Sequence, residues 1–202
     1  MQLDERLDRE TDELRVEADA ELTTLLGSVT SSDYRQFLER TLGFVAPFER
    51  SLWATAGLER VVDMRRFQKR TLLRHDLLGF GLKHDEIGAL SRCSIPQFES
   101  PEVALGWAYV VERSTLPHVD VFRHLASVMP GDVAYTASYL RAHFGAARAN
   151  WREFVDAINA IAATTDRADT LVAAAKAAFQ ARREWRDRYE EIAIGGRRVR
   201  VA

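Results

Sequence analysis

The sequence of 202 residues has a single cysteine, Cys93, so it can form neither an internal disulfide nor a zinc site of paired cysteines. It also lacks any apolar run approaching the roughly 20 residues that a transmembrane helix needs. The N-terminal stretch MQLDERLDRETDELR is acidic and polar, unlike a signal peptide or a transit peptide. We therefore expect a cytoplasmic protein that does not enter a membrane.

A dominant charge of one sign is missing as well. Lysine and arginine total 28 against 30 aspartates and glutamates, which gives a formal net charge of −2. This balance offers no overall attraction to nucleic acid or to an anionic membrane, and we expect neither as a partner. Only Lys69, Lys83 and Lys176 are lysine, and all other basic residues are arginine. Arginine suits bidentate pairing with carboxylates, although the base composition of a genome explains the same bias.

Proline and glycine are scarce, with 5 and 11 copies, and they lie where helices are expected to end. Apolar side chains recur at helical spacing from about residue 3 to residue 25, which predicts one amphipathic helix ended by Gly27. The residues Thr30-Ser31-Ser32-Asp33 predict the N-cap of a second helix that continues to about Leu52. Pro47 lies inside that helix and is expected to kink it.

The rest of the chain also has the pattern of helices, and only the C-terminal RRVRVA alternates like a strand. We expect helices over about 58–80, from Pro101 to about Pro130 with Pro117 in the interior, over about 132–143 and 147–163, and from about Asp166 to Gly195. Residues 82–100 are expected to form a short helical turn and a loop. The sequence therefore predicts an all-α domain of about eight helices over residues 1–194, with a short frayed tail over 195–202.

Several stretches resemble bacterial heme oxygenases, especially those that accompany bacteriophytochromes. The segment ALGWAYVVERSTLPHVDVFRHL resembles the family's distal helix, which reads as a small-residue start, a Tyr-Val stretch, Glu-Gly-Ser-Thr-Leu-Gly-Gly and a basic-Leu ending. Four further segments are similar to the family in the same order and spacing: YRQFLERTLGFVAPFERSLW, RHDLLGFGL, SYLRAHFGAARANWREFVDAI and AAAKAAFQARREW. Together they cover nearly the whole chain.

The resemblance implies a specific chemistry. Heme lies flat between two helices, and a neutral imidazole from the first helix binds the iron. Glycines on the distal helix let its backbone approach the opposite face of the heme. With O2 and electrons from a reductase, such enzymes convert heme to biliverdin, iron and CO. Heme as the cofactor, biliverdin as a ligand, a reductase and a bacteriophytochrome as partners are therefore implied.

This chain departs from the family pattern at three places. The family's first helix reads like Thr-x-x-Leu-His, but ETDELRVEAD has Arg15 at the histidine position. Arginine cannot replace this ligand, because its guanidinium is permanently protonated and has no free lone pair for iron. On the distal helix, Arg113 stands at an expected glycine, and Pro117-His118 replaces Gly-Gly. These changes indicate a divergent member without the proximal histidine and argue against ordinary heme degradation.

Two interpretations compete for each candidate residue. Arg15 is either a surface residue paired with Asp12 or Asp19, or a clamp for a ligand carboxylate. His118 is either a packed helix residue or an iron ligand from the distal side, and it is the one candidate for binding the iron of heme. The residues that we expect to contact a tetrapyrrole are Arg15, Tyr109, Glu112, Arg113, Ser114, Pro117, His118 and Arg141. Further candidates for contacting propionates are Arg74, Tyr135 and Tyr139.

Three classes of function remain open. The first is a heme oxygenase with an unusual ligand, and the second is a non-catalytic or regulatory protein that binds heme or a bilin. The third is a non-heme metal oxidase of the same fold, with Asp120 and His124 as a metal pair at i and i+4. A solvent-side role is the commoner meaning of such a pair, and no Glu-x-x-His motif accompanies it. Cys93 is expected to be an ordinary loop or buried residue.

Overall fold

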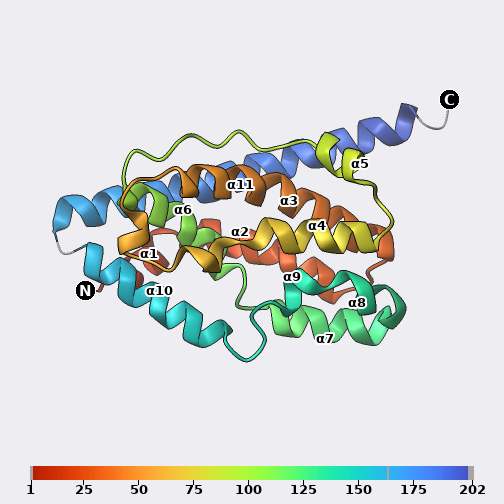
Figure 1. Ribbon diagram of the computed structural model, residues 1–202, viewed down its shortest axis with the longest axis horizontal. Helices are drawn as coiled ribbons and strands as arrows, with labels where there is room; N and C mark the ends of the chain where they lie inside the picture. Colours follow the sequence, from red (N-terminus) through yellow and green to blue (C-terminus); the bar gives the residue numbers. More distant parts are fainter. Residues whose placement is uncertain (1, 163, 200–202) are drawn as a thin grey trace.

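The computed structural model describes residues 2–162 and 164–199, and it describes side chains as far as residue 191. Over these residues the protein is all-α and contains no strand. Figure 1 shows long helices lying roughly along one axis, with shorter helices at one side. In chain order the helices are α1 (Leu3–Glu10), α2 (Asp12–Thr23), η1 (Thr24–Leu26), α3 (Ser31–Trp53), η2 (Leu58–Arg60), η3 (Met64–Phe67), α4 (Lys69–Gly79), α5 (His84–Ala89), α6 (Pro101–Arg113), α7 (His118–Val128), α8 (Pro130–Thr136), α9 (Ser138–Arg141), α10 (Ala147–Ile161) and α11 (Thr165–Val199).

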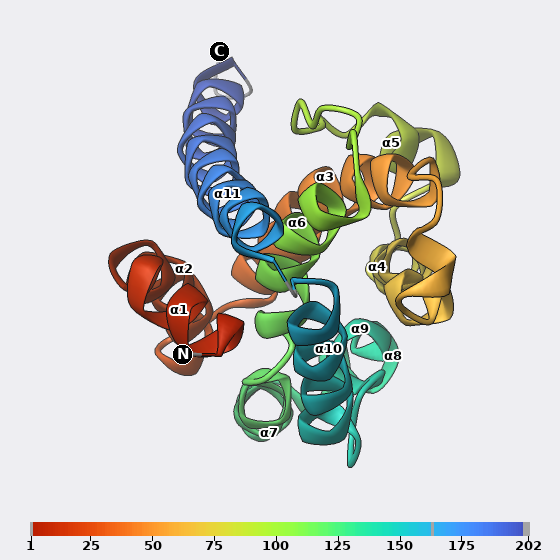
Figure 2. The same cartoon turned by 90° about the vertical axis from the view of Figure 1, so that its left-hand side faces the viewer.

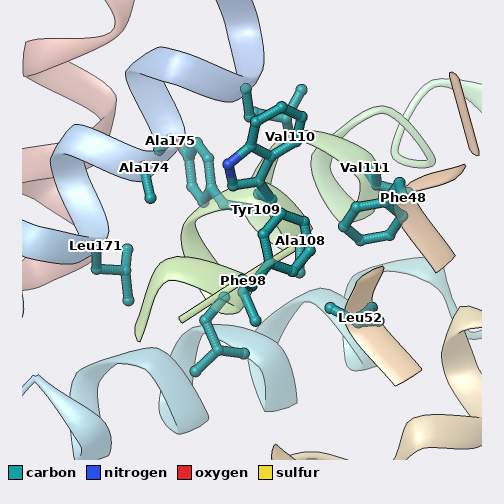
Figure 3. Close-up of a cluster of buried hydrophobic side chains, with 14 of the residues drawn as sticks. Phe48, Leu52, Phe98, Ala108, Tyr109, Val110, Val111, Leu171, Ala174 and Ala175 are labelled. Carbon is teal, nitrogen blue, oxygen red and sulfur yellow. The ribbon is translucent and has the colours of Figure 1, made fainter. Parts of the chain in front are cut away.

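Helix α6 forms the centre of the fold, with α3, α10 and α11 packed around it (Figure 2). Residues 104–112 of α6 are all buried, because neighbours cover every side of this helix. Figure 3 shows side chains of α6 between α11 and α3. The approach of α11 is close: a Cβ on Gly106 would lie 2.5 Å from the carbonyl oxygen of Leu171 and 2.6 Å from Cβ of Ala174. Glycine is therefore required at this crossing.

Helix α3 connects two clusters of buried side chains. Phe44, Phe48 and Leu52 belong to the cluster around α6 and α11, whereas Tyr34 and Phe37 belong to a second cluster with α4, α7 and α9. The predicted N-cap is confirmed, because the Thr30 side chain accepts a hydrogen bond from the Asp33 backbone, which completes a capping box. Pro47 lies inside α3, as expected.

The first predicted helix is in fact two. α1 ends at Glu10 and α2 begins at Asp12, because Thr11 departs from helical geometry with φ −114° and ψ 11°. The buried Thr11 hydroxyl donates to the Leu7 carbonyl at 2.8 Å and stabilises the break. Helix α1 buries Leu3 and Leu7, but α2 buries only Leu22. The apolar contacts of α2 are therefore few: besides Leu22, Leu14 and Ala18 are partly buried against the cluster around α6 and α11.

Two further helix predictions were too long. Two 3-10 turns, η2 and η3, replace the start of the helix expected over 58–80, and α4 begins only at Lys69. The helix expected from Pro101 to Pro130 breaks between α6 and α7. Over the break Thr115 and Leu116 donate to carbonyls three residues back, and Pro117 has no N–H with which to continue the helix.

The remaining helices lie close to the expected ranges, with the first short one divided into α8 and α9. Helix α11 continues to Val199, past Gly195 and Gly196 where we expected it to end. Residues 200–202 lie outside the described residues, and a frayed tail and a domain over 1–194 stay predictions. Within the described residues, no helix is both long enough and apolar enough to cross a membrane.

Candidate functional site

A cavity lies between α2, α3, the bend that joins α6 to α7, and α11. Its volume is about 30 Å³, which is room for about two water molecules. The walls combine apolar and aromatic side chains with one histidine, three arginines and one glutamate. The lining residues are Glu21, Leu22, Phe37, Arg40, Thr41, Phe44, Val45, Val111, Ser114, His118, Tyr139, Arg182, Trp185 and Arg186.

His118 is the most unusual residue in the cavity wall. It is 2% exposed, and neither ring nitrogen has a hydrogen-bond partner among the described residues. Burial lowers the pKa of His118 to about 3, with smaller contributions from nearby His143 and Lys69. The imidazole is therefore neutral at physiological pH, and its ring packs edge-on against Tyr139 at 4.7 Å. A buried neutral imidazole with a free lone pair is a potential metal ligand.

Glu21 of α2 lies between two arginines from other helices. One carboxylate oxygen is 2.6 Å from Nε of Arg40 on α3, and the other accepts a hydrogen bond from Arg182 of α11 at 3.1 Å. Burial alone would raise the pKa of Glu21, but the two guanidiniums outweigh this effect and lower its pKa. The carboxylate therefore stays charged. Arg186, one turn beyond Arg182, adds a third cation to the wall.

An open groove lies next to the cavity, on the other side of Leu22. It has a volume of about 290 Å³ and is lined mainly by apolar side chains of α2 and of the α6–α7 bend. Arg113 and Asp19 cross the groove as an ion pair with an N–O distance of 2.7 Å. Leu22 lines both spaces, so it separates the groove from the cavity.

The sequence-predicted residues lie in different places. Ser114 and His118 line the cavity, and its wall also includes Tyr139. Arg113 and Pro117 line the open groove. The structure thus brings the α6–α7 candidates together around the cavity and the neighbouring groove, which we call together the cleft.

The remaining candidates lie away from the cavity. Arg15 is half-buried and forms an ion pair with Asp12, one of the two partners expected for a surface role. The Tyr109 hydroxyl donates to Asp8 at 2.7 Å, so it ties α6 to α1. Arg141 is exposed, with its guanidinium over the Phe122 ring.

Glu112 is buried on the other side of α6. Its carboxylate lies 2.6 Å from Nζ of Lys69 and 2.8 Å from Nη2 of Arg66. Burial alone would raise the pKa of Glu112, but these cations reverse the effect and lower it. The negative charge of Glu112 is therefore balanced by Lys69 and Arg66 inside the protein. Arg74 is partly exposed and Tyr135 is highly exposed, so neither lines the cavity.

Asp120 and His124 do not converge on a common point. Asp120 is exposed and lies 3.6 Å from Nη1 of Arg123, whereas Nε2 of His124 lies 3.1 Å from the Gly27 carbonyl oxygen. In the described part of the chain, no three or more His, Cys, Asp or Glu side chains gather as a metal site would require. This arrangement gives the non-heme metal oxidase no structural support.

Sequence reasoning missed the charged residues of the cavity wall: Glu21, Arg40, Arg182 and Arg186. A signal was present in QARREWR, where Arg182 and Arg186 stand one turn apart on either side of Trp185. Nothing in the sequence showed that Arg40 and Glu21, on two other helices, would meet them.

Residues 1–188 match the heme oxygenase family model. The chain belongs to the heme oxygenase family. Its fold is similar to that of a solved structure, the NO- and CO-bound heme oxygenase from Neisseria meningitidis, with a TM-score of 0.76 over 94% of this chain and 93% of that chain. The two sequences are 20% identical, so this likeness supports the heme oxygenase fold and no finer property. No curated protein matches the sequence.

Membership of the heme oxygenase family implies heme, and the cavity wall fits heme chemically. His118 offers a free nitrogen lone pair to iron, and Arg40, Arg182 and Arg186 offer cations to carboxylates. The free space of about 30 Å³ is far smaller than a porphyrin, so heme could enter only if the helices around the cavity moved apart.

Proposed function

We propose that this chain binds heme, or a related dianionic tetrapyrrole such as biliverdin, in the cleft between α2 and the α6–α7 bend. The observation that supports this most strongly is His118, a buried neutral imidazole with both nitrogens unpaired in the wall of a cavity. A polar side chain with this much unmet hydrogen-bonding capacity calls for an explanation, and a ligand provides one.

His118 would be the ligand to iron. Its lone pair is available because the low pKa keeps the ring unprotonated. Arg15 cannot serve, because a guanidinium has no free lone pair, and it already pairs with Asp12. We therefore propose that the proximal histidine is lost and that the ligand comes from the distal side. Heme, when bound, supplies an iron centre that can bind O2 and exchange electrons.

The three arginines of the wall would hold the carboxylates of the ligand. Arg40 and Arg182 come from α3 and α11, which are anchored in the two core clusters, so their positions do not depend on α2. The indole N–H of Trp185 also donates to the Arg40 carbonyl at 2.9 Å and fixes α3 against α11. Paired guanidiniums on a rigid frame suit carboxylate recognition.

Helix α2 would move to admit the ligand. It fully buries one side chain, Leu22, and packs Leu14 and Ala18 partly against the core; ion pairs of Glu17, Asp19 and Glu21 with arginines of α3, α6 and α11 add to this attachment. Water and salt ions can replace the exposed pair of Glu17 at small cost, whereas the buried pairs of Glu21 need a replacement carboxylate. The breaks at Thr11 and Gly27 delimit the segment that would move.

We further propose that binding does not lead to ordinary ring opening. The side chains of Arg113 and Pro117 stand at the cleft, where the family's glycines let the backbone approach the heme. Family membership favours one alternative, conversion of heme to biliverdin with electrons from a reductase. Incubation with hemin and either ascorbate or a reductase distinguishes binding without ring opening from conversion to biliverdin. We expect no bilin absorption band, and the appearance of one would establish the conversion.

We also propose a subtype and a protein partner for this chain. The motif likeness to the enzymes that accompany bacteriophytochromes supports that subtype, and with it a bacteriophytochrome as a recipient of bound bilin. An electron donor is needed only if the chain is catalytic. Copurification with a bacteriophytochrome in the native host would test the partner directly.

The decisive experiment is a hemin titration followed by absorption spectroscopy of three proteins. The wild-type chain is expected to give a saturable one-to-one complex with a sharp Soret band from a nitrogen-ligated iron. His118→Ala should lose the nitrogen-ligated spectrum, because among the described residues it removes the only imidazole in the cavity wall. His124→Ala, on the same helix but outside the cavity, is the matched control and should behave as wild type. Identical spectra for all three proteins would refute His118 ligation, and free-hemin spectra for wild type would refute heme binding.

A further inference from the structure

Glu21 has an unusual position for a residue on a loosely attached helix. Its side chain is 8% exposed and lies between Arg40 and Arg182, which are 15% and 17% exposed. The three charges come from three separate helices, α2, α3 and α11. The cations belong to two helices with many residues in the core clusters, and the anion belongs to α2, which fully buries only Leu22.

The pairing of Arg40 with Glu21 is incomplete. Nε of Arg40 is 2.6 Å from the Glu21 carboxylate, but this contact lacks hydrogen-bond geometry, and the buried Nε has no hydrogen-bond partner among the described residues. Arg182 does donate to Glu21, at 3.1 Å. Glu21 therefore neutralises the two cations without fully satisfying their donors.

If α2 left the cleft alone, Arg40 and Arg182 would lose their carboxylate. Removing the carboxylate from a mostly buried charge cluster is costly, because two neighbouring cations then lose their shared counterion. A ligand that brings a carboxylate to the same place removes this cost. The side chain of glutamate, two methylenes and a carboxylate, has the same chemistry as the propionate of a porphyrin.

We infer that Arg40 and Arg182 form a carboxylate-binding subsite, that Glu21 occupies it when no ligand is bound, and that a ligand propionate displaces Glu21 and releases α2. The inference rests on the proposed function for the identity of its ligand. It adds a selection rule: the cleft opens for tetrapyrroles with free carboxylates and stays closed to their esters.

Substitution of Glu21 tests this directly. Glu21→Gln keeps the shape and removes the charge, so the ligand no longer competes with an internal carboxylate. Glu17→Gln is the matched control, because Glu17 lies one turn away on α2, pairs with Arg183 at 3.5 Å, and does not line the cavity. The probe is protoporphyrin IX, followed by fluorescence, because it has both propionates and no iron and thus does not depend on His118 ligation.

We expect Glu21→Gln to bind protoporphyrin IX about tenfold tighter or more than wild type, as removal of a charge-assisted competitor predicts. Glu17→Gln should stay close to wild type, because its ion pair with Arg183 is long and both side chains are more than a third exposed, so it contributes little to holding α2. The dimethyl ester should bind weakly to all three proteins. Equal or weaker binding of protoporphyrin IX by Glu21→Gln would overturn the inference while leaving the proposed function intact. Tight binding of the ester would overturn it as well.

A second measurement does not need a tetrapyrrole. Glu21→Ala leaves a gap beside the two arginines, and added propionate should fill it and raise the thermal midpoint of this variant. Wild type, Glu17→Ala, and Glu21→Ala with equimolar chloride or propionamide should show no such rise. Rescue without any tetrapyrrole binding would support the subsite and refute the proposed function. Absence of rescue would overturn the subsite. If Glu21→Ala does not fold, the protoporphyrin titration of Glu21→Gln still tests the inference.

Discussion

The buried imidazole of His118 costs the folded state free energy, because both nitrogens exchange water for apolar surroundings and gain no partner in return. Its pKa of about 3 adds a pH dependence. Between pH 6.5, the ordinary value, and pH 3, the unfolded chain binds a proton that the folded chain refuses. The free energy of unfolding therefore decreases progressively as the pH falls from 6.5 to 3.

His118→Leu is therefore expected to stabilise the protein by about 1–3 kcal/mol at neutral pH, the cost of an unsatisfied buried polar group. It should also flatten the loss of stability between pH 6.5 and pH 3. Urea unfolding at a series of pH values measures both effects. His124→Leu, on the same helix, should show neither. A less stable His118→Leu protein would indicate that the imidazole is hydrated or bonded in solution.

Glu49 is a second titratable group, and its effect on how stability changes with pH is opposite to that of His118. Its buried carboxylate accepts a hydrogen bond from the backbone N–H of Arg70 at 2.7 Å, at the start of α4. Burial raises the pKa of Glu49 to about 7, against the lowering effect of the hydrogen bonds from Arg70 and Lys69. The folded chain thus holds a proton that the unfolded chain releases between pH 4.5 and pH 7.

The stability provided by protonated Glu49 is fully present below pH 4.5 and is lost as the pH rises through 7. The total change is on the order of 3 kcal/mol, because the pKa of Glu49 rises from 4.5 to about 7 on folding. Glu49→Gln should remove this loss, so its stability relative to wild type should increase from pH 5 to pH 8. Thermal denaturation across this range tests the prediction. A constant difference between the two proteins would contradict it.

At the scale of the helix, the crossing of α6 and α11 allows a direct test of packing. A methyl group on Gly106 would collide with the backbone of α11, whereas a Cβ on Gly88 of α5 has no atom within 4 Å. Gly106→Ala should destabilise the fold by about 1–3 kcal/mol through overpacking. Gly88→Ala should raise stability by up to about 1 kcal/mol, because alanine favours the helix. Urea unfolding of both variants compares them, and equal effects would contradict the predicted crossing.

The contrast between α2 and α6 predicts different mobility. Backbone amides of α2 should exchange hydrogen much faster than those of α6, because ion pairs hold α2 and a packed core surrounds α6. Salt at 1 M shortens the screening length to about 3 Å and should accelerate exchange in α2 selectively. Hydrogen exchange with mass spectrometry measures both segments together. Equal protection of α2 and α6 would contradict the opening proposed for the cleft.

For the whole molecule, sequence patterns predicted the class of fold and the placement of most helices. Capping residues and apolar spacing are local signals, and the start of α3 at Thr30 and of α6 at Pro101 follow from them. The break at Thr11 and the late start of α4 at Lys69 were missed, because the helical spacing of apolar residues continues across both positions. The motif order gave the family, which the family match confirms.

The candidate site was predicted only in part. His118, Ser114, Arg113 and Pro117 come from one short segment, so their proximity follows from helical geometry. Arg182 and Glu21 are 161 residues apart, and only the packing of α2 on α11 brings them together. Charges of this kind look like surface residues in sequence, because helices rich in ion pairs usually face solvent.

The Glu21 carboxylate between Arg40 and Arg182 has a consequence for how tightly anything can be held there. Uptake exchanges one carboxylate for another of the same chemistry, so the gross strength of the contact largely cancels. This contact then contributes only a small difference to the free energy of binding, and the Glu21 carboxylate can displace the ligand as readily as the ligand displaces it. A protein with this arrangement is suited to pass its cargo on to the next acceptor instead of sequestering it.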